Sequence, residues 1–251
     1  MAHRYWVGTS GWVYPHWRGV FYPPKVSSNR WLSFYVAEFP SVEINFSFYR
    51  LPQEKTFAGW SRRVPDDFRF AVKASRFITH IRRLKDCREP LETFLGRARS
   101  LGENLGPILY QMPPNFHRKE QNEAALADFL SILPRDMRHV FEFRHDSWFH
   151  SDVFALLRLH NVGFCAFHMV DWQTPAEATT DFAYMRFHGS GSLYGGCYDE
   201  TELRHWAGHL RALPDDVEDV YVYFNNDAYG FAVQNARELG QLLGREYSER
   251  D

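Results

Sequence analysis

The chain has 251 residues, of which 45% are hydrophobic and 24% charged, and its formal net charge is −2. An α/β barrel takes about 250 residues as one domain, so we expect a single domain over residues 1–251. The balanced charge argues against a globally basic nucleic-acid binder. The three cysteines show neither zinc nor disulfide spacing, and no apolar run is typical of a signal peptide or a membrane span. We therefore expect a cytoplasmic protein with no membrane partner.

Short runs rich in β-branched and aromatic residues alternate with longer amphipathic stretches, which is typical of βα units around a parallel sheet. The predicted strands cover residues 5–9, 41–45, 68–73, 106–111, 139–143, 163–167, 182–187 and 219–224. Apolar residues at helical spacing predict helices over residues 28–39, 53–63, 89–101, 122–133, 152–160, 200–213 and 230–243. A TIM-type (β/α)8 barrel closes with eight strands, so we predict this α/β fold. The spacing between the starts of the predicted strands is uneven, so we expect an irregular barrel. An open doubly wound sheet is the alternative.

Polar side chains recur at alternate positions near the carboxyl ends of these apolar strands. The set comprises Glu43, Asn45, Lys73, Gln111, Glu142, Arg144, His168, Arg186 and His188, and Asn225 and Asn226 follow the last strand. Burying so many ionisable groups is costly unless they are paired or solvated, and proteins accept that cost mainly at functional sites. Because catalysis in barrels takes place at the carboxyl ends of the strands, we expect a functional pocket there. A purely structural network of ion pairs is the alternative.

Fixed cations in one barrel mouth favour an anionic substrate, with a phosphate ester as the leading candidate. They are Lys73, Arg144 and Arg186. In the alternative arrangement, Arg144 pairs with Glu43 and Lys73 pairs with Glu142, which would leave no net field for an anion.

The residue types predict acid/base chemistry of the hydrolase or lyase kind. The candidate catalytic residues are Glu43, Glu142, Lys73, His80 and His188. The two glutamates could transfer protons or bind a metal, Lys73 could act as a Schiff-base nucleophile, and a histidine could be the second proton-transfer group. The candidate substrate-binding residues are Gly8, Thr9, Tyr14, Asn45, Gln111, Arg144, Asp171, Arg186, Tyr194, Asn225 and Asn226.

A divalent zinc or manganese ion is a candidate cofactor, because carboxylate and imidazole ligands suit both metals. The ligands would be Glu43, Glu142, His168, Asp171 and His188, although the chain has no tight ligand motif. The turn from Gly8 to Gly11 could form a backbone nest for an anion or a simple tight turn. The stretch from Gly189 to Ser192 could bind a phosphate or act as a lid.

Motifs along nearly the whole chain resemble those of the YecE-like family, catalogued as domain of unknown function 72. They are Gly8-Thr9-Ser10-Gly11-Trp12, Val42-Glu43-Ile44-Asn45, Phe70-Ala71-Val72-Lys73-Ala74, Gln111-Met112-Pro113-Pro114, Phe141-Glu142-Phe143-Arg144-His145, Arg186-Phe187-His188-Gly189 and Phe224-Asn225-Asn226. The resemblance implies a TIM-type barrel and names no reaction.

Two other functions remain open from the sequence. A nucleic-acid-binding or nucleic-acid-processing barrel is favoured by the aromatic residues after the first strand and by the arginines between Arg76 and Arg83. A non-catalytic protein that binds a small molecule would use the same pocket without turnover. The identity of the substrate and the oligomeric state are also left open.

Overall fold

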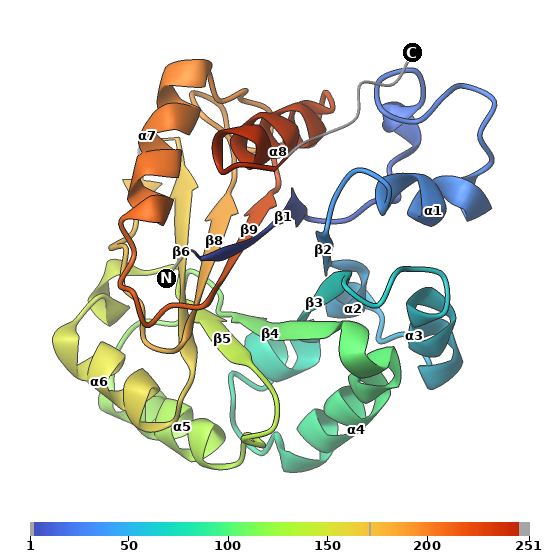
Figure 1. Ribbon diagram of the computed structural model, residues 1–251. Coiled ribbons are helices and arrows are strands. Elements are labelled where there is room, and N and C mark those ends of the chain that lie inside the picture. The colour runs from blue at the N-terminus through green and yellow to red at the C-terminus, as the bar shows by residue number, and fades with distance from the viewer. Residues whose placement is uncertain (1–2, 171, 246–251) are drawn as a thin grey trace.

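All eight predicted strands form in the computed structural model, which describes residues 3–170 and 172–245. They are β1 (Arg4–Thr9), β2 (Ser41–Ile44), β3 (Arg69–Lys73), β4 (Leu105–Gln111), β5 (His139–Glu142), β6 (Gly163–Met169), β8 (Phe182–Phe187) and β9 (Asp219–Phe224). They pair in parallel in the order β1-β9-β8-β6-β5-β4-β3-β2. Each strand lies beside its sequence neighbours, so the sheet curls into a nearly closed barrel (Figure 1). The predicted TIM-type fold is confirmed.

Helices surround the strands on the outside of the barrel (Figure 1). The seven predicted helices correspond to α1 (Trp31–Tyr35), α3 (Glu54–Ser61), α4 (Arg88–Ala98), α5 (Glu120–Ser131), α6 (Ser151–Leu159), α7 (Glu200–Arg211) and α8 (Phe231–Leu242). Each buries an apolar face against the sheet, as the helical spacing predicts. The 3₁₀ helices η2 (Ser28–Arg30) and η4 (Arg99–Asn104) extend two of the predicted segments.

Several short elements were not predicted. They are the 3₁₀ helices η1 (Pro15–Trp17) and η5 (Asp146–Trp148), the single turn α2 (Phe46–Tyr49), the π-helix η3 (Phe77–Ile81) and the strand β7 (Trp172–Gln173). The strand β7 pairs antiparallel with β6 and carries the chain back along the barrel. The described part of the connection from β6 to β8 therefore contains no helix, which is the irregularity of this barrel.

The barrel has a seam where β1 meets β2, the two ends of the hydrogen-bonded order. The hydroxyl of Tyr35 bridges the seam: it accepts from the backbone N–H of Thr9 at 2.9 Å and donates to the carbonyl of Ser41 at 3.1 Å. A Cβ atom at Gly8 would lie 2.0 Å from the Ser41 carbonyl oxygen, so only glycine permits this approach. One buried tyrosine hydroxyl thus takes the place of a backbone hydrogen bond between β1 and β2.

Alternate residues of the strands fill the lumen. A buried apolar cluster is made of Trp6, Ala71, Leu109, Val140, Cys165, Phe182, Tyr184, Tyr221 and Tyr223. Two positions further along the same strand faces come Lys73, Gln111, Glu142 and Arg186. The period-two pattern therefore places an apolar plug below a polar layer at the carboxyl ends.

The amino end of the barrel is closed by a separate charged network around Asp219, which is 3% exposed. Its carboxylate accepts from Arg4 Nε at 2.6 Å, from Trp6 Nε1 at 2.8 Å and from Arg138. Arg138 also lies over the ring of Phe182 at 5.2 Å. In barrels this end serves stability rather than catalysis, and its closed contacts agree with that.

Candidate functional site

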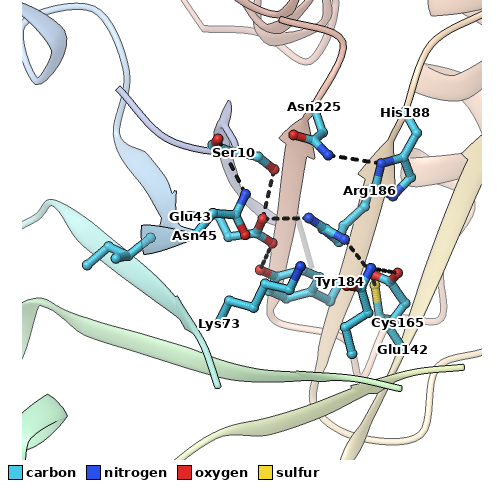
Figure 2. Close-up of polar contacts among 12 residues, drawn as sticks. Ser10, Glu43, Asn45, Lys73, Glu142, Cys165, Tyr184, Arg186, His188 and Asn225 are labelled. Carbon is cyan, nitrogen blue, oxygen red and sulfur yellow. Dashed lines mark hydrogen bonds and ion pairs between the residues drawn. The ribbon is translucent and has the colours of Figure 1, made fainter. Parts of the chain in front are cut away.

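The centre of the polar layer is one arginine held between two glutamates (Figure 2). Arg186 of β8 donates through Nη2 to Glu43 of β2 at 2.8 Å and through Nη1 to Glu142 of β5 at 2.7 Å. All three side chains are at most 1% exposed. The two carboxylates therefore lie on opposite sides of one guanidinium group, across the lumen from each other.

Each carboxylate has further donors. Glu43 accepts from Ser10 Oγ and from the hydroxyl of Tyr184, both at 2.7 Å. Glu142 accepts from Gln111 Nε2 at 2.7 Å and from Arg144 Nε. This saturation fixes both side chains in position and leaves them few free lone pairs for a reaction.

Glu142 stays ionised in this environment. Burial alone would raise the pKa of its carboxyl group, but the adjacent charges of Arg144 and Arg186 outweigh burial and hold the pKa well below the ordinary value of 4.5. A carboxyl group that does not carry a proton near neutral pH is a poor general acid. The bonds of Glu142 hold Arg144 and Arg186 in place, and the proton transfer expected from the sequence stays a prediction that this low pKa disfavours for a general acid.

Arg144, His188 and Asn225 form a chain along the rim. Arg144 Nη2 lies 2.7 Å from His188 Nε2, and a guanidinium group only donates, so Nε2 accepts and Nδ1 carries the proton. Burial, followed by the charges of Arg186 and Arg144, lowers the pKa of His188 well below 6.5 and keeps the ring neutral. The amide of Asn225 lies 3.2 Å from Nδ1, and its oxygen accepts that proton once the amide is turned to match.

Lys73 stands apart from the paired charges. Its chain reaches from the end of β3 toward the cluster (Figure 2), yet no carboxylate oxygen of the described residues lies within 4.0 Å of its ammonium group. Its Nζ lies 4.4 Å from the centre of the Phe48 ring. Burial, with the charge of Arg186, lowers the pKa of Lys73 from 10.5 to about 7. Near neutral pH this amine is therefore present in both protonation states.

His80 lies beside Lys73 on the same aromatic ring. Its imidazole meets Phe48 edge-on with ring centres 4.9 Å apart, and Thr79 Oγ1 lies 2.9 Å from its Nδ1. Burial, followed by the charge of Lys73, lowers the pKa of His80 to about 4. The imidazole of His80 is therefore neutral near pH 7, whereas the pKa of the neighbouring Lys73 amine lies near that pH.

The structure corrects the ion pairs considered from the sequence. Arg144 pairs with Glu142 rather than Glu43, and Glu43 pairs with Arg186. Lys73 does not pair with Glu142. Two arginines and two glutamates thus neutralise one another, and within residues 3–170 and 172–245 Lys73 has no carboxylate partner.

Several predicted binding residues lie in supporting positions. Gly8 and Thr9 belong to the β1–β2 seam. Gly8 packs against the Ser41 carbonyl and Thr9 bonds to the Tyr35 hydroxyl, so they form no open anion nest. Asn226 is fully buried and donates to the carbonyl of Gly196 and to Asn235, which holds the loop after β8.

Other predicted residues do reach the mouth. Tyr14 donates to the carbonyl of Ser10 at 2.5 Å, and Asn45 Nδ2 donates to the same oxygen at 3.4 Å. The ring of Tyr194 meets His188 edge-on with centres 5.6 Å apart. Asp171 lies outside the described residues.

The described members of the predicted metal set are not grouped around one point. His168 points to the helix layer, where it contacts the Tyr198 hydroxyl at 2.8 Å and packs on Trp206 of α7. The alternation was predicted correctly, but His168 occupies the outward face, because Cys165 and Phe167 take the inward one. Within residues 3–170 and 172–245, no three His, Cys, Asp or Glu side chains are grouped so that they could hold a metal ion.

Three contributors to the site were missed from the sequence: Ser10, Tyr184 and Cys165. Tyr184 lies two residues before Arg186 on the same strand face, so the alternation could have identified it. The alternation along β6 could have identified Cys165 in the same way. Its Sγ lies 3.6 Å from Glu142 Oε2. Ser10 follows β1, and only the fold shows that it turns toward β2.

Fold and site together define a class of protein: a TIM-type barrel whose ionisable side chains gather at the carboxyl ends of the strands. The chain belongs to the family described as "Protein of unknown function DUF72", whose family model matches residues 6–250. This confirms the family that the motifs predicted. Among the described residues, no helix is both long and apolar enough to cross a membrane.

Relatives support this assignment along the chain. The UPF0759 protein YunF of Bacillus subtilis (strain 168) is 30% identical over 97% of this chain and 96% of its own length. The UPF0759 protein YecE of Escherichia coli (strain K12) is 31% identical, and that match covers 57% of this chain and 50% of YecE. The crystal structure of a DUF72 family protein from Thermotoga maritima MSB8 has a TM-score of 0.88 at 32% identity and covers 97% of this chain and 100% of that one.

Proposed function

We propose that the protein is an enzyme that performs acid/base chemistry on a small anionic substrate held over Lys73. The observation that carries this proposal is the Lys73 amine at the carboxyl ends of the barrel strands, which has a pKa of about 7 and no carboxylate partner in the described part of the chain. A group whose pKa lies near the operating pH is best suited to accept and donate protons. Proteins shift a lysine this far mainly where its chemistry is used.

The surrounding residues have complementary roles in this proposal. The neutralised cluster of Glu43, Glu142, Arg144 and Arg186 forms a rigid polar floor that holds its geometry during a reaction. An anionic group that binds beside Lys73 favours the ammonium form, and its departure favours the free amine, so substrate binding and protonation are coupled. His80, neutral and on the same ring of Phe48, places a polar group beside Lys73 without adding a competing charge.

The test is a turnover screen of phosphorylated and carboxylated metabolites with the wild type, Lys73→Met and the control Lys55→Met on exposed α3. General acid/base catalysis contributes about 10²- to 10⁴-fold, so we expect Lys73→Met to lose at least 100-fold in kcat/KM while Lys55→Met keeps wild-type activity. A turnover that survives in Lys73→Met would contradict the proposal. Turnover by the wild type would also exclude a non-catalytic binding protein, which predicts a ligand but no reaction.

A further inference from the structure

Exposed apolar side chains gather at the mouth of the barrel. Of the ten large hydrophobic side chains that are exposed among the described residues, all but Leu159 lie between a barrel strand and the outer helix that covers it, and four of these are on the short helices α2 and η3. Scattered exposed apolar residues are ordinary, but confinement of so many to one face indicates a surface that contacts a ligand.

An apolar cavity of about 480 Å³ lies on the β1–β2 side of the mouth. Its aromatic walls are Trp12, Tyr14, Phe46, Tyr49 and Trp60. Phe46 is 56% exposed and Tyr49 is 74% exposed, so two of these rings are open to an incoming flat molecule. Aromatic side chains at a cavity entrance stack well on planar rings.

The same cavity has one unused polar atom. Asn45 lines it, and the Oδ1 atom of Asn45 is buried without a hydrogen-bond partner among the described residues. The bond from Asn45 Nδ2 to the Ser10 carbonyl fixes which end of the amide is the oxygen. A buried acceptor without a donor is costly, so this wall suits a ring that carries an N–H or O–H group.

A second cavity of about 340 Å³ lies on the β3–β4 side of the mouth, and its walls are basic. The cations that line it are Arg82, Arg83, Lys85 and Lys119. No carboxylate lines this cavity, and no carboxylate oxygen of the described residues lies within 4.0 Å of these four cations. Arg83 donates to Asn115 at 3.0 Å, which fixes one guanidinium against the opposite wall. Four unpaired positive charges suit a phosphate dianion better than a single carboxylate.

Lys73 lies between the two cavities. Tyr49 of the apolar cavity packs on Phe48 with ring centres 5.0 Å apart, and Phe48 contacts the Lys73 ammonium group. On the other side, His80 lies close enough to Lys73 and Arg83 for both charges to act on it. Around the rim, the order is therefore aromatic cavity, Lys73 and basic cavity.

We propose that the substrate is a mononucleotide, with its base in the aromatic cavity and its phosphate in the basic cavity. This inference rests on the proposed function and names its substrate class. A nucleotide carries a flat heteroaromatic ring with N–H donors at one end and a phosphate dianion at the other, in the order in which the rim presents complementary walls. Its middle portion then lies over Lys73 and His80.

The test is isothermal titration calorimetry with the 5′-monophosphates of adenosine, guanosine, cytidine and uridine, the matching nucleosides and inorganic phosphate. At least one nucleotide should bind about tenfold more tightly than its nucleoside.

The variant Arg82→Ala/Lys85→Ala should remove that difference. The variant Phe46→Ala/Tyr49→Ala should weaken nucleotide and nucleoside together by about tenfold or more, since each stacked base contributes about 1–3 kcal/mol. Controls are Arg135→Ala and Leu159→Ala, both exposed and outside the mouth.

Three results would overturn the inference: no nucleotide binds, both double variants bind as the wild type does, or only a single-stranded oligonucleotide binds. Its failure is distinguishable from failure of the proposed function. Turnover of another anion that depends on Lys73, without nucleotide affinity, would remove the inference and leave the function. Nucleotide binding without any turnover that depends on Lys73 would remove the proposed function and leave a nucleotide-binding site at the mouth.

Discussion

A largely desolvated lysine such as Lys73, which has no carboxylate partner among the described residues, lowers the stability of the fold that contains it. The folded-state pKa of Lys73, about 7, lies below the ordinary value of 10.5, so folding is penalised wherever the unfolded chain holds the proton more tightly. The penalty is fully present below about pH 7 and disappears as the pH rises toward 10.5.

We therefore expect Lys73→Met to be more stable than the wild type at pH 7, by on the order of 4 kcal/mol before changes in packing. The gain should shrink toward zero near pH 10. Urea unfolding of both proteins at pH 7 and pH 10 measures the difference. A variant that is equally destabilised at both values would show that the amine is not depressed in the folded state.

At the scale of single residues, most members of the site could be predicted from the sequence, but their roles could not. Alternation in the strand sequences brought Glu43, Glu142 and Arg186 together correctly. Which cation pairs with which anion depends on the distances across the lumen, and a sequence pattern contains no such distances. The result is that Arg144 and Arg186, rather than Lys73, pair with Glu142.

At the scale of the elements, the strands and long helices followed from composition and periodicity, because each extends over enough residues to show a period. The single turn α2 and the π-helix η3 could not be predicted in this way, since one turn is too short to show a repeat. Both elements contribute to the mouth: α2 supplies Phe48, and η3 supplies His80. The elements hardest to predict are therefore the ones that shape the site.

The β1–β2 seam gives a prediction about Tyr35. Replacing Tyr35 with Phe leaves the Thr9 N–H buried without an acceptor, so we expect a loss of about 1–3 kcal/mol in the free energy of unfolding. The control is Tyr229→Phe, whose side chain is 70% exposed and which should change stability little. Thermal and urea unfolding compare the two variants. Equal effects would mean that the hydroxyl does not bridge the strands.

At the scale of the whole molecule, two charged networks close the two ends of the barrel for different purposes. The network at the amino end is built on Asp219, whose pKa is lowered because its bonds to Arg4, Arg138 and Trp6 outweigh its burial. We expect Asp219→Asn to destabilise the protein by roughly 1–3 kcal/mol, since a neutral amide replaces the buried carboxylate that accepts the charge-assisted bonds of Arg4 and Arg138. It should leave the nucleotide affinity of the mouth unchanged.

Calorimetric titration and urea unfolding of the same samples check both parts of this prediction. The matched control is Asp67→Asn, an exposed aspartate at the same end of the barrel. If Asp219→Asn weakened ligand binding as strongly as it weakened folding, the two ends would not be independent.

The seam also determines when the barrel can be completed during synthesis. The strand β1 leaves the ribosome first, yet its hydrogen-bonded neighbour is β9, and Arg4 pairs with Asp219 across 215 positions of the chain. Its neighbour in sequence, β2, offers it the Tyr35 bridge but no ladder. The strand made first is therefore secured last, and a nascent chain that stops before β9 carries an unpaired apolar strand, which is the kind of surface that chaperones bind.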